Sequence, residues 1–262
     1  MPIVDSHCHV ALSWYEPVES LLRQMDANGV EKAILIQMMG QYDNEYQRAC
    51  ARRYAERLAS VVLVDVERAD CADQLEREAD RGAVGVRLRP TTRSRGDDPL
   101  AIWRVAVRRN LSVSCGGTGA DFASPSFAQL VSEFPGLKIV IEHLGSVNRP
   151  DDDRNLVTRR RVFGLARYSN VYIKFHGLGE FAPRAMPVTE PFPFAQPIPR
   201  TLRMAYEAFG ADRMMWGSDY PPVAGREGYR NALHLPLSEL ADLTDDERAL
   251  AFGGVAMTVF PV

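Results

Sequence analysis

The 262-residue sequence is poor in cysteine, and the few cysteines it has are far apart. Cys8, Cys50, Cys71 and Cys115 form no C-x-x-C pair. A chain of this length can bury a full hydrophobic core without disulfides, so these thiols do not read as a disulfide framework. Scattered thiols fit a reducing compartment, and we expect a cytoplasmic protein.

The sequence also lacks an excess of charge of one sign and lacks long hydrophobic runs. Its 31 basic and 34 acidic residues give a net charge of −3, which provides no general attraction to nucleic acid or anionic lipid. No stretch approaches the roughly 18 apolar residues of a membrane span, and the N-terminus shows no export signal. We therefore expect no nucleic-acid or membrane partner, and a small molecule as ligand.

What is present is the composition of a folded globular protein, with 46% hydrophobic and 25% charged residues. Short runs rich in Val and Ile alternate with longer segments of helical period. Most of the runs lack strict polar alternation, which is typical of strands covered on both faces. The expected strands are residues 3–8, 32–37, 60–64, 83–88, 111–115, 137–142, 171–175 and 214–217.

The segments between these runs carry apolar residues at three- and four-residue spacing, which predicts helices. The expected helices are residues 17–28, 44–57, 70–81, 99–109, 124–134, 155–168, 199–209 and 228–241. Eight strand–helix units in about 250 residues match a single (β/α)8 TIM barrel, which we expect to span residues 1–262 as one domain. The alternative is an open doubly wound sheet, but no glycine-rich phosphate turn follows the first strand.

Residues 181–199 interrupt this alternation with closely spaced prolines and with Phe192 and Phe194. Proline excludes a lasting helix or a central strand, so we expect a long loop after the seventh strand. Loops after barrel strands build the active-site face. Two interpretations follow for this loop: a lid over the substrate, or a brace packed on the rim.

Four of the five histidines fall at or just after the predicted carboxyl ends of strands. His7 and His9 lie in Asp-Ser-His-Cys-His, and side-chain alternation places both imidazoles on one face. Two neutral imidazoles there can share a divalent ion such as zinc, and the alternative is two polar residues at a strand end. His234 lies inside a predicted helix, where we expect a structural role.

His143 and His176 end the sixth and seventh predicted strands. The alternative for His143 is an imidazole that caps the strand and bonds a loop carbonyl. The period of two places Lys174 on the same face as His176. Because a buried lysine is costly without a partner, Lys174 should meet a carboxylate or a bound anion.

Asp219 follows the eighth predicted strand in the segment Trp-Gly-Ser-Asp-Tyr-Pro-Pro. Gly217 leaves room for a close approach, and Pro221 stops the strand. A carboxylate presented at the barrel mouth can complete a metal shell or take a proton from water. In isolation, the same Asp-x-Pro pattern would indicate a turn residue.

Arginines gather on the fourth predicted strand and the loop after it. Arg87 and Arg89 share a face, and a guanidinium group binds a carboxylate through two hydrogen bonds. Anion binding by Arg87 favours an organic acid as substrate. Arg93 and Arg95 fit a solvated basic loop.

As a set, these segments resemble the amidohydrolase-related proteins of the amidohydrolase superfamily. The resemblance is carried by residues 5–9, 85–88, 142–145, 172–174 and 216–221, and it runs from Pro2 to about Phe260. It is strongest to the branch that holds sugar-lactone lactonases and 2-pyrone-4,6-dicarboxylate lactonase. The motifs are specific as a set, although none is specific alone.

The resemblance implies a (β/α)8 hydrolase in which an activated water attacks a carbonyl group. It implies catalytic roles for Asp219, His176 and His143, with Asp219 as the base. It also implies a metal held by His7, His9, His143 and Asp219. One divalent ion, with zinc favoured, is the expected cofactor, although one branch of relatives is thought to work without metal.

The expected substrate-binding residues are Arg87, Lys174 and Cys115. Cys115 ends the fifth predicted strand, where many superfamily members present a histidine, a glutamate or a modified lysine, so a binuclear site is not expected. His176 stands where the lactonase branch often carries serine. The substrate class therefore does not follow from the resemblance.

The favoured function is hydrolysis of a cyclic ester or amide, with a small carboxylated lactone as substrate. Two alternatives stay open: non-oxidative decarboxylation by a mononuclear zinc enzyme, and a non-catalytic barrel that binds a small ligand. Trp14 and Tyr15 follow the first strand, and they fit either substrate contact or the interface of a homo-oligomer.

Overall fold

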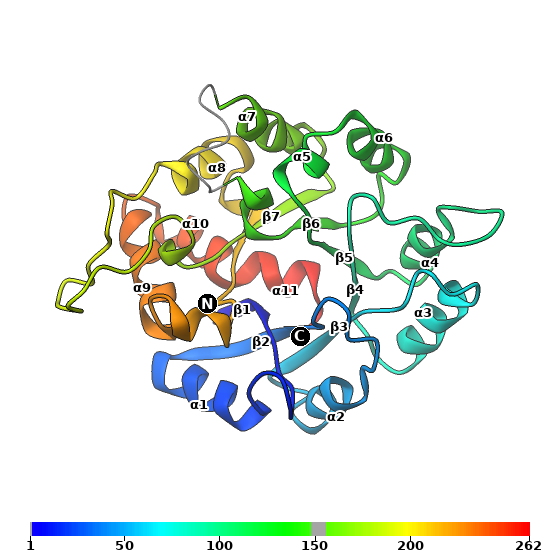
Figure 1. Ribbon diagram of the computed structural model, residues 1–262, viewed down its shortest axis with the longest axis horizontal. Helices are drawn as coiled ribbons and strands as arrows, with labels where there is room; N and C mark the ends of the chain where they lie inside the picture. Colours follow the sequence, from blue (N-terminus) through cyan, green and yellow to red (C-terminus); the bar gives the residue numbers. More distant parts are fainter. Residues whose placement is uncertain (1, 148–155) are drawn as a thin grey trace.

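Eight parallel strands in sequence order form the centre of the computed structural model, which describes residues 2–147 and 156–262 (Figure 1). The strands are β1 (Ile3–Cys8), β2 (Val30–Ile36), β3 (Leu58–Val62), β4 (Gly85–Leu88), β5 (Ser112–Cys115), β6 (Ile139–Ile141), β7 (Val171–Phe175) and β8 (Met214–Trp216). This order confirms the predicted barrel, because a doubly wound sheet would reverse its strand order part-way.

The barrel closes through the chain that follows β8. Cys8 at the end of β1 forms a parallel bridge with Tyr220. Two backbone hydrogen bonds join the same segments: His9 N–H donates to the Tyr220 carbonyl at 2.8 Å, and Asp219 N–H donates to the His7 carbonyl at 2.8 Å. The closing contact thus lies at the carboxyl ends of the strands.

Helices follow the strands and surround the barrel (Figure 1). They are α1 (Val18–Asn28), α2 (Glu45–Arg53), α3 (Cys71–Asp80), α4 (Ala101–Arg108), α5 (Gly119–Phe122), α6 (Pro125–Glu133), α7 (Val157–Phe163), α8 (Thr201–Phe209), α9 (Tyr229–Glu239), α10 (Asp245–Ala249) and α11 (Val255–Val259). Helix α1 buries Val18, Leu21 and Met25. It ends at Gly29, whose φ of 68° is the left-handed conformation that the sequence predicts there.

Most element boundaries differ from the predictions by one to three residues, as in β2, β3 and β6, and a few elements differ by more. Helix α2 ends at Arg53 rather than at residue 57. Position 155, the predicted start of a helix, lies outside the described residues, and the rest of that segment divides into α7 and a short 3-10 helix, Gly164–Arg167. The sequence did not predict α5, α10, α11 or the π-helical turn Leu250–Gly254 that joins the last two.

The C-terminal segment fills the end of the barrel where the strands begin. Helix α11 crosses the centre of the barrel in Figure 1. Phe260 is fully buried in a cluster with Val4, Val61 and Met215 from the strands. The ring of Phe260 also lies 5.1 Å from the ammonium group of Lys174. This segment therefore packs under the site as well as sealing the barrel.

The proline-rich segment forms a projecting hairpin. Arg184 and Phe194 form an antiparallel bridge. The side chains of Met186 and Val188 near its tip are 75% and 51% exposed. Figure 1 shows this loop extending away from the barrel. None of the described helices is long and apolar enough to cross a bilayer.

The packing of Phe260 predicts that Phe260→Ala lowers the free energy of unfolding by about 3–5 kcal/mol, because it leaves a cavity in the barrel interior. Phe192→Ala, a matched truncation in the projecting hairpin, should cost less than about 1 kcal/mol. Chemical denaturation of both variants measures the difference. Equal losses in the two variants would contradict the sealing role of Phe260.

Candidate active site

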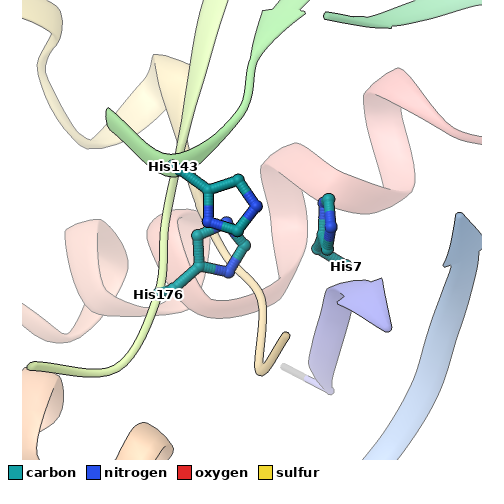
Figure 2. A group of neighbouring side chains, drawn as sticks. All are labelled: His7, His143 and His176. Carbon is teal, nitrogen blue, oxygen red and sulfur yellow. The ribbon is translucent and has the colours of Figure 1, made fainter. Parts of the chain in front are cut away.

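Three histidines from three different strands face one another at the carboxyl end of the barrel (Figure 2). His7 comes from β1, His143 follows β6 and His176 follows β7. The ring centre of His7 lies 5.0 Å from that of His143 and 4.9 Å from that of His176. The rings of His143 and His176 are stacked at 4.1 Å. The structure thus brings together residues that the sequence separates by more than 160 positions.

His9 lies beside His7, as predicted, with ring centres 4.9 Å apart. Its Nδ1 is 2.7 Å from the Ile36 carbonyl, so Nδ1 carries the proton that is donated. In the uncharged form of the ring, Nε2 keeps its lone pair for a metal ion, and Nε2 lies 3.5 Å from Asp219 Oδ1. A backbone contact therefore fixes the tautomer that a metal ligand or proton acceptor requires.

His176 is held in the same way. Its Nδ1 is 2.9 Å from the carbonyl of Gly217. Nε2 is buried and has no hydrogen-bond partner among the described residues, and the same is true of His7 Nε2. Burial, followed by the positive charge of His143, lowers the pKa of His176 to about 3, so this ring is neutral.

His143 has the opposite charge state. Its Nδ1 is 2.6 Å from Glu180 Oε1, in the 3-10 helix η3 (Leu178–Glu180). Burial alone would lower the pKa of His143, but the Glu180 carboxylate outweighs burial and raises the pKa to about 9. The site therefore pairs a cationic imidazole with a neutral one, which is the separation expected of groups with different catalytic roles.

Asp219 has a φ of 57°, a conformation uncommon for a residue other than glycine. Its Oδ2 accepts a hydrogen bond of 2.8 Å from Arg226 Nη1, and its Oδ1 lies 3.9 Å from His7 Nε2. Burial opposes ionisation, but His9 and His143 together hold the pKa of this carboxyl well below its usual range. Asp219 is thus an anion with one oxygen anchored and the other facing histidines.

A second buried network lies beside these residues. Arg87 donates to both oxygens of Glu142, with the shortest contact at 2.7 Å. Ser114 donates to Glu142 Oε1 at 2.7 Å and accepts from Lys174 Nζ at 2.9 Å. Lys174 is thus linked to a carboxylate, as the sequence predicted, but the link passes through the hydroxyl group of Ser114. Lys174 Nζ also lies 3.5 Å from His7 Nδ1.

The charged groups in this network shift one another's pKa values. Burial favours the protonated acid, but Arg87 and Lys174 lower the pKa of Glu142 to about 2. Burial also lowers the pKa of Lys174 to about 7, against the attraction of Glu142. Arg87 therefore has a buried carboxylate as its main partner.

Some predicted residues lie away from this group. Cys115 packs with apolar residues in the layer between strands and helices, on the face of β5 opposite to Ser114. His234 is exposed on α9, and Arg93 and Arg95 are exposed on the loop after β4. The structure gives these residues no contact with the histidine cluster.

Four residues that the sequence did not assign join the site: Glu142, Glu180, Arg226 and Glu227. Glu142 immediately precedes His143, where its charge inside an apolar strand was a usable signal. Glu180, Arg226 and Glu227 come from loops after β7 and β8, and no periodicity points to their direction. Tyr15, which the sequence left between two roles, packs its ring 5.4 Å from His9.

The donor set fits a divalent metal ion. Three overlapping groups place one ligand atom per residue within 4.8 Å of each other: His7, His143 and His176; His7, His9 and Asp219; and His143, Glu180 and Asp219. Imidazole nitrogens and a carboxylate oxygen are the ligands of zinc enzymes with an open position. The buried Nε2 atoms without partners on His7 and His176 are the observation that supports this fit.

Comparison with known proteins gives one family. A family model described as Amidohydrolase matches residues 4–262. An L-fucono-1,5-lactonase from Burkholderia ambifaria is 26% identical over 242 residues, which is 87% of this chain and 79% of that protein. The family match includes both the first histidine pair and the segment after β8.

Solved structures show the same fold. A protein of Acinetobacter baumannii, named as a probable 2-pyrone-4,6-dicarboxylic acid hydrolase with citric acid bound, has a TM-score of 0.74 and 18% identity. An amidohydrolase of Burkholderia multivorans with bound zinc has a TM-score of 0.76 and 18% identity. Both comparisons cover 100% of each chain.

The Glu180 contact predicts that His143 in the metal-free protein stays protonated through neutral pH. Its folded pKa of about 9 exceeds the ordinary 6.5, so the pair stabilises the fold fully below about pH 6.5 and loses this contribution as the pH rises through 9. Glu180→Gln should lower the His143 pKa and remove that pH dependence. Imidazole NMR titration and unfolding at pH 6 to 10 measure both effects.

Glu133→Gln, which removes a surface carboxylate near Arg104, is the control and should leave the titration of His143 unchanged. A His143 pKa that is the same with and without the Glu180 carboxylate would contradict this account.

Proposed function

We propose that this chain opens the ring of a small lactone by attack of an activated water on the carbonyl carbon. The chain belongs to the amidohydrolase family and is a hydrolase. The observation that carries the proposal is the convergence of one anchored carboxylate and three imidazole nitrogens. Asp219 Oδ1 lies 3.5 Å from His9 Nε2 and 3.9 Å from His7 Nε2, beside the stacked ring pair that includes His176.

Asp219 is the residue that accepts the proton of water. Its carboxylate stays ionised because nearby histidines lower its pKa, and the same shift makes it a weak base toward ordinary water. A divalent ion bound here would supply Lewis acidity, which makes its water a stronger acid and stabilises developing negative charge. The weak basicity of Asp219 therefore favours a metal-dependent reaction.

His7, His9 and Asp219 are the residues proposed to hold the ion, with His176 contributing its unpartnered Nε2. His143 is suited to another task because it is already an imidazolium paired with Glu180. A cationic donor can stabilise the oxyanion that forms at the carbonyl, and one such donor typically contributes about 3–4 kcal/mol. Displacing the His143 proton in favour of a metal would oppose the Glu180 contact.

A lactone is favoured as the substrate because the curated relative is a lactonase of L-fucono-1,5-lactone by name and a solved relative is named for a pyrone dicarboxylate. The carboxylated lactone predicted from Arg87 stays a proposal. Arg87 is 8% exposed and shares Glu142, so it would bind a substrate carboxylate with its remaining donors only. Lys174 is proposed to act from the same buried network.

Asp219→Asn should lower kcat on the best lactone by about 10²- to 10⁴-fold, because it removes the proton acceptor, and should leave substrate binding measurable. Asp212→Asn, an exposed carboxylate at the opposite end of β8, is the control and should keep activity. The panel includes L-fucono-1,5-lactone, 2-pyrone-4,6-dicarboxylate and small aromatic acids. Full turnover by Asp219→Asn would overturn the role of Asp219, and release of carbon dioxide from the acids would indicate a decarboxylase instead.

Removal of metal should abolish lactone hydrolysis, and one equivalent of zinc should restore it. His9→Asn should weaken zinc binding, measured by competition with a chelator, since it removes a ligand whose tautomer is fixed by Ile36. His234→Asn on the exposed face of α9 is the control. Undiminished hydrolysis by protein shown to be metal-free would refute the metal part of the proposal.

A further inference from the structure

Glu227 is a fully buried carboxylate that lies outside the residues proposed for catalysis. It lies between Arg226 and the start of α9, and its side chain is 0% exposed. Neither of its oxygens has a hydrogen bond of good geometry among the described residues. Burial raises the pKa of this carboxyl, against the attraction of Arg226 and weaker contacts with the backbone N–H groups of Glu227 itself and Gly179. An apolar side chain would fill such a space at lower cost, so packing alone does not explain an acid here.

The loop after β7 is built closely around this carboxylate. A Cβ atom on Gly177 would lie 1.7 Å from Glu227 Oε1, and one on Gly179 would lie 1.9 Å from Oε2. No side chain can occupy either position while Glu227 keeps its place. The backbone of residues 177–179 therefore limits how far the Glu227 carboxylate can move.

The cation beside Glu227 is a residue of the site. Arg226 Nε lies 3.5 Å from Glu227 Oε2. On the other side of the same guanidinium group, Nη1 donates to Asp219 Oδ2 at 2.8 Å and lies 3.5 Å from Glu180 Oε1. Arg226 Nε has no hydrogen-bond partner among the described residues, so this contact is an ion pair without a hydrogen bond. Because the guanidinium group is planar and rigid, attraction at Nε also favours one direction of Nη1.

We propose that Glu227 is a positioning residue for Asp219 and that it acts through Arg226. It holds the guanidinium group from the side away from the histidines and keeps Nη1 on Asp219 Oδ2. Asp219 then presents only Oδ1 to His7 and His9. The inference rests on the proposed function, because the orientation of Asp219 matters only if this carboxylate serves the reaction.

The test compares Glu227→Gln with the unaltered protein on the lactone that the latter hydrolyses fastest. Glutamine keeps the shape and removes the charge. We expect kcat to fall about 10- to 100-fold, KM to stay within about twofold, and zinc affinity to weaken about 10- to 100-fold. Glu78→Gln removes a carboxylate paired with Arg48 between α2 and α3, and it should change none of these values.

A merely structural role is separated by a double-mutant cycle with Arg226→Gln. If Glu227 acts through Arg226, adding Glu227→Gln to Arg226→Gln should change kcat less than about twofold, whereas two independent losses would multiply. Multiplied losses, or a Glu227→Gln protein with unchanged kcat and unchanged zinc affinity, would overturn the inference. If Glu227→Gln fails to fold, Glu227→Asp, which withdraws the carboxylate from Arg226, should show the same loss of kcat.

The two proposals fail in different ways. If the unaltered protein hydrolyses no lactone, the proposed function is wrong. The positioning role is then decided by zinc affinity: weaker binding by Glu227→Gln than by the unaltered protein supports it, and equal binding overturns it. If the unaltered protein hydrolyses a lactone, and Glu227→Gln does so equally well and binds zinc with the same affinity, only the positioning role is wrong.

Discussion

The site depends on two backbone hydrogen bonds that join the chain after β1 to the chain after β8. These bonds run from Asp219 N–H to the His7 carbonyl and from His9 N–H to the Tyr220 carbonyl. They close the barrel and set the spacing of one carboxylate and two imidazoles from opposite ends of the sequence. Gly217 permits this approach, because a Cβ atom there would lie 2.6 Å from His7 Cβ.

Closure also explains why buried charge is tolerated. The main ionised groups of the site are paired with opposite charges: Arg87 with Glu142, Arg226 with Asp219, and His143 with Glu180. Removing one member of such a pair leaves an uncompensated buried charge, which costs far more than the pair itself contributes. The charged residues therefore constrain one another's protonation states.

The strands and the histidines that end them could be predicted because their information is local. Runs of Val and Ile mark buried parallel strands, and residues that end such strands must meet at one edge of the barrel. That reasoning places His7, His143 and Asp219 together without any contact information. The prediction for Cys115 was wrong, because side chains alternate along a strand. Ser114 points toward Glu142, so Cys115 points into the apolar layer between strands and helices.

The partners of those residues could not be predicted, because they come from loops. Glu180 and Arg226 follow glycines and prolines, and neither residue belongs to a periodic segment. Their directions are set by the turns after β7 and β8, which no hydrophobic pattern predicts. Arg87 is a related case: its position on β4 was evident from the sequence, but its pairing with Glu142 depends on how β4 and β6 lie across the barrel.

The balance of buried charge links the metal to the charge of the substrate. Among the described residues, five carboxyl groups face the site or its supporting network: Asp5, Glu142, Glu180, Asp219 and Glu227. Three cations oppose them, Arg87, His143 and Arg226, and Lys174 adds a fraction of a charge near neutral pH because burial lowers its pKa to about 7. When these carboxyl groups are ionised and no metal is bound, the group carries a net negative charge that disfavours an anionic substrate. A divalent ion reverses that sign, so a carboxylated lactone and a metal-dependent reaction are linked by electrostatics, whereas a metal-independent site with these residues would suit a neutral lactone.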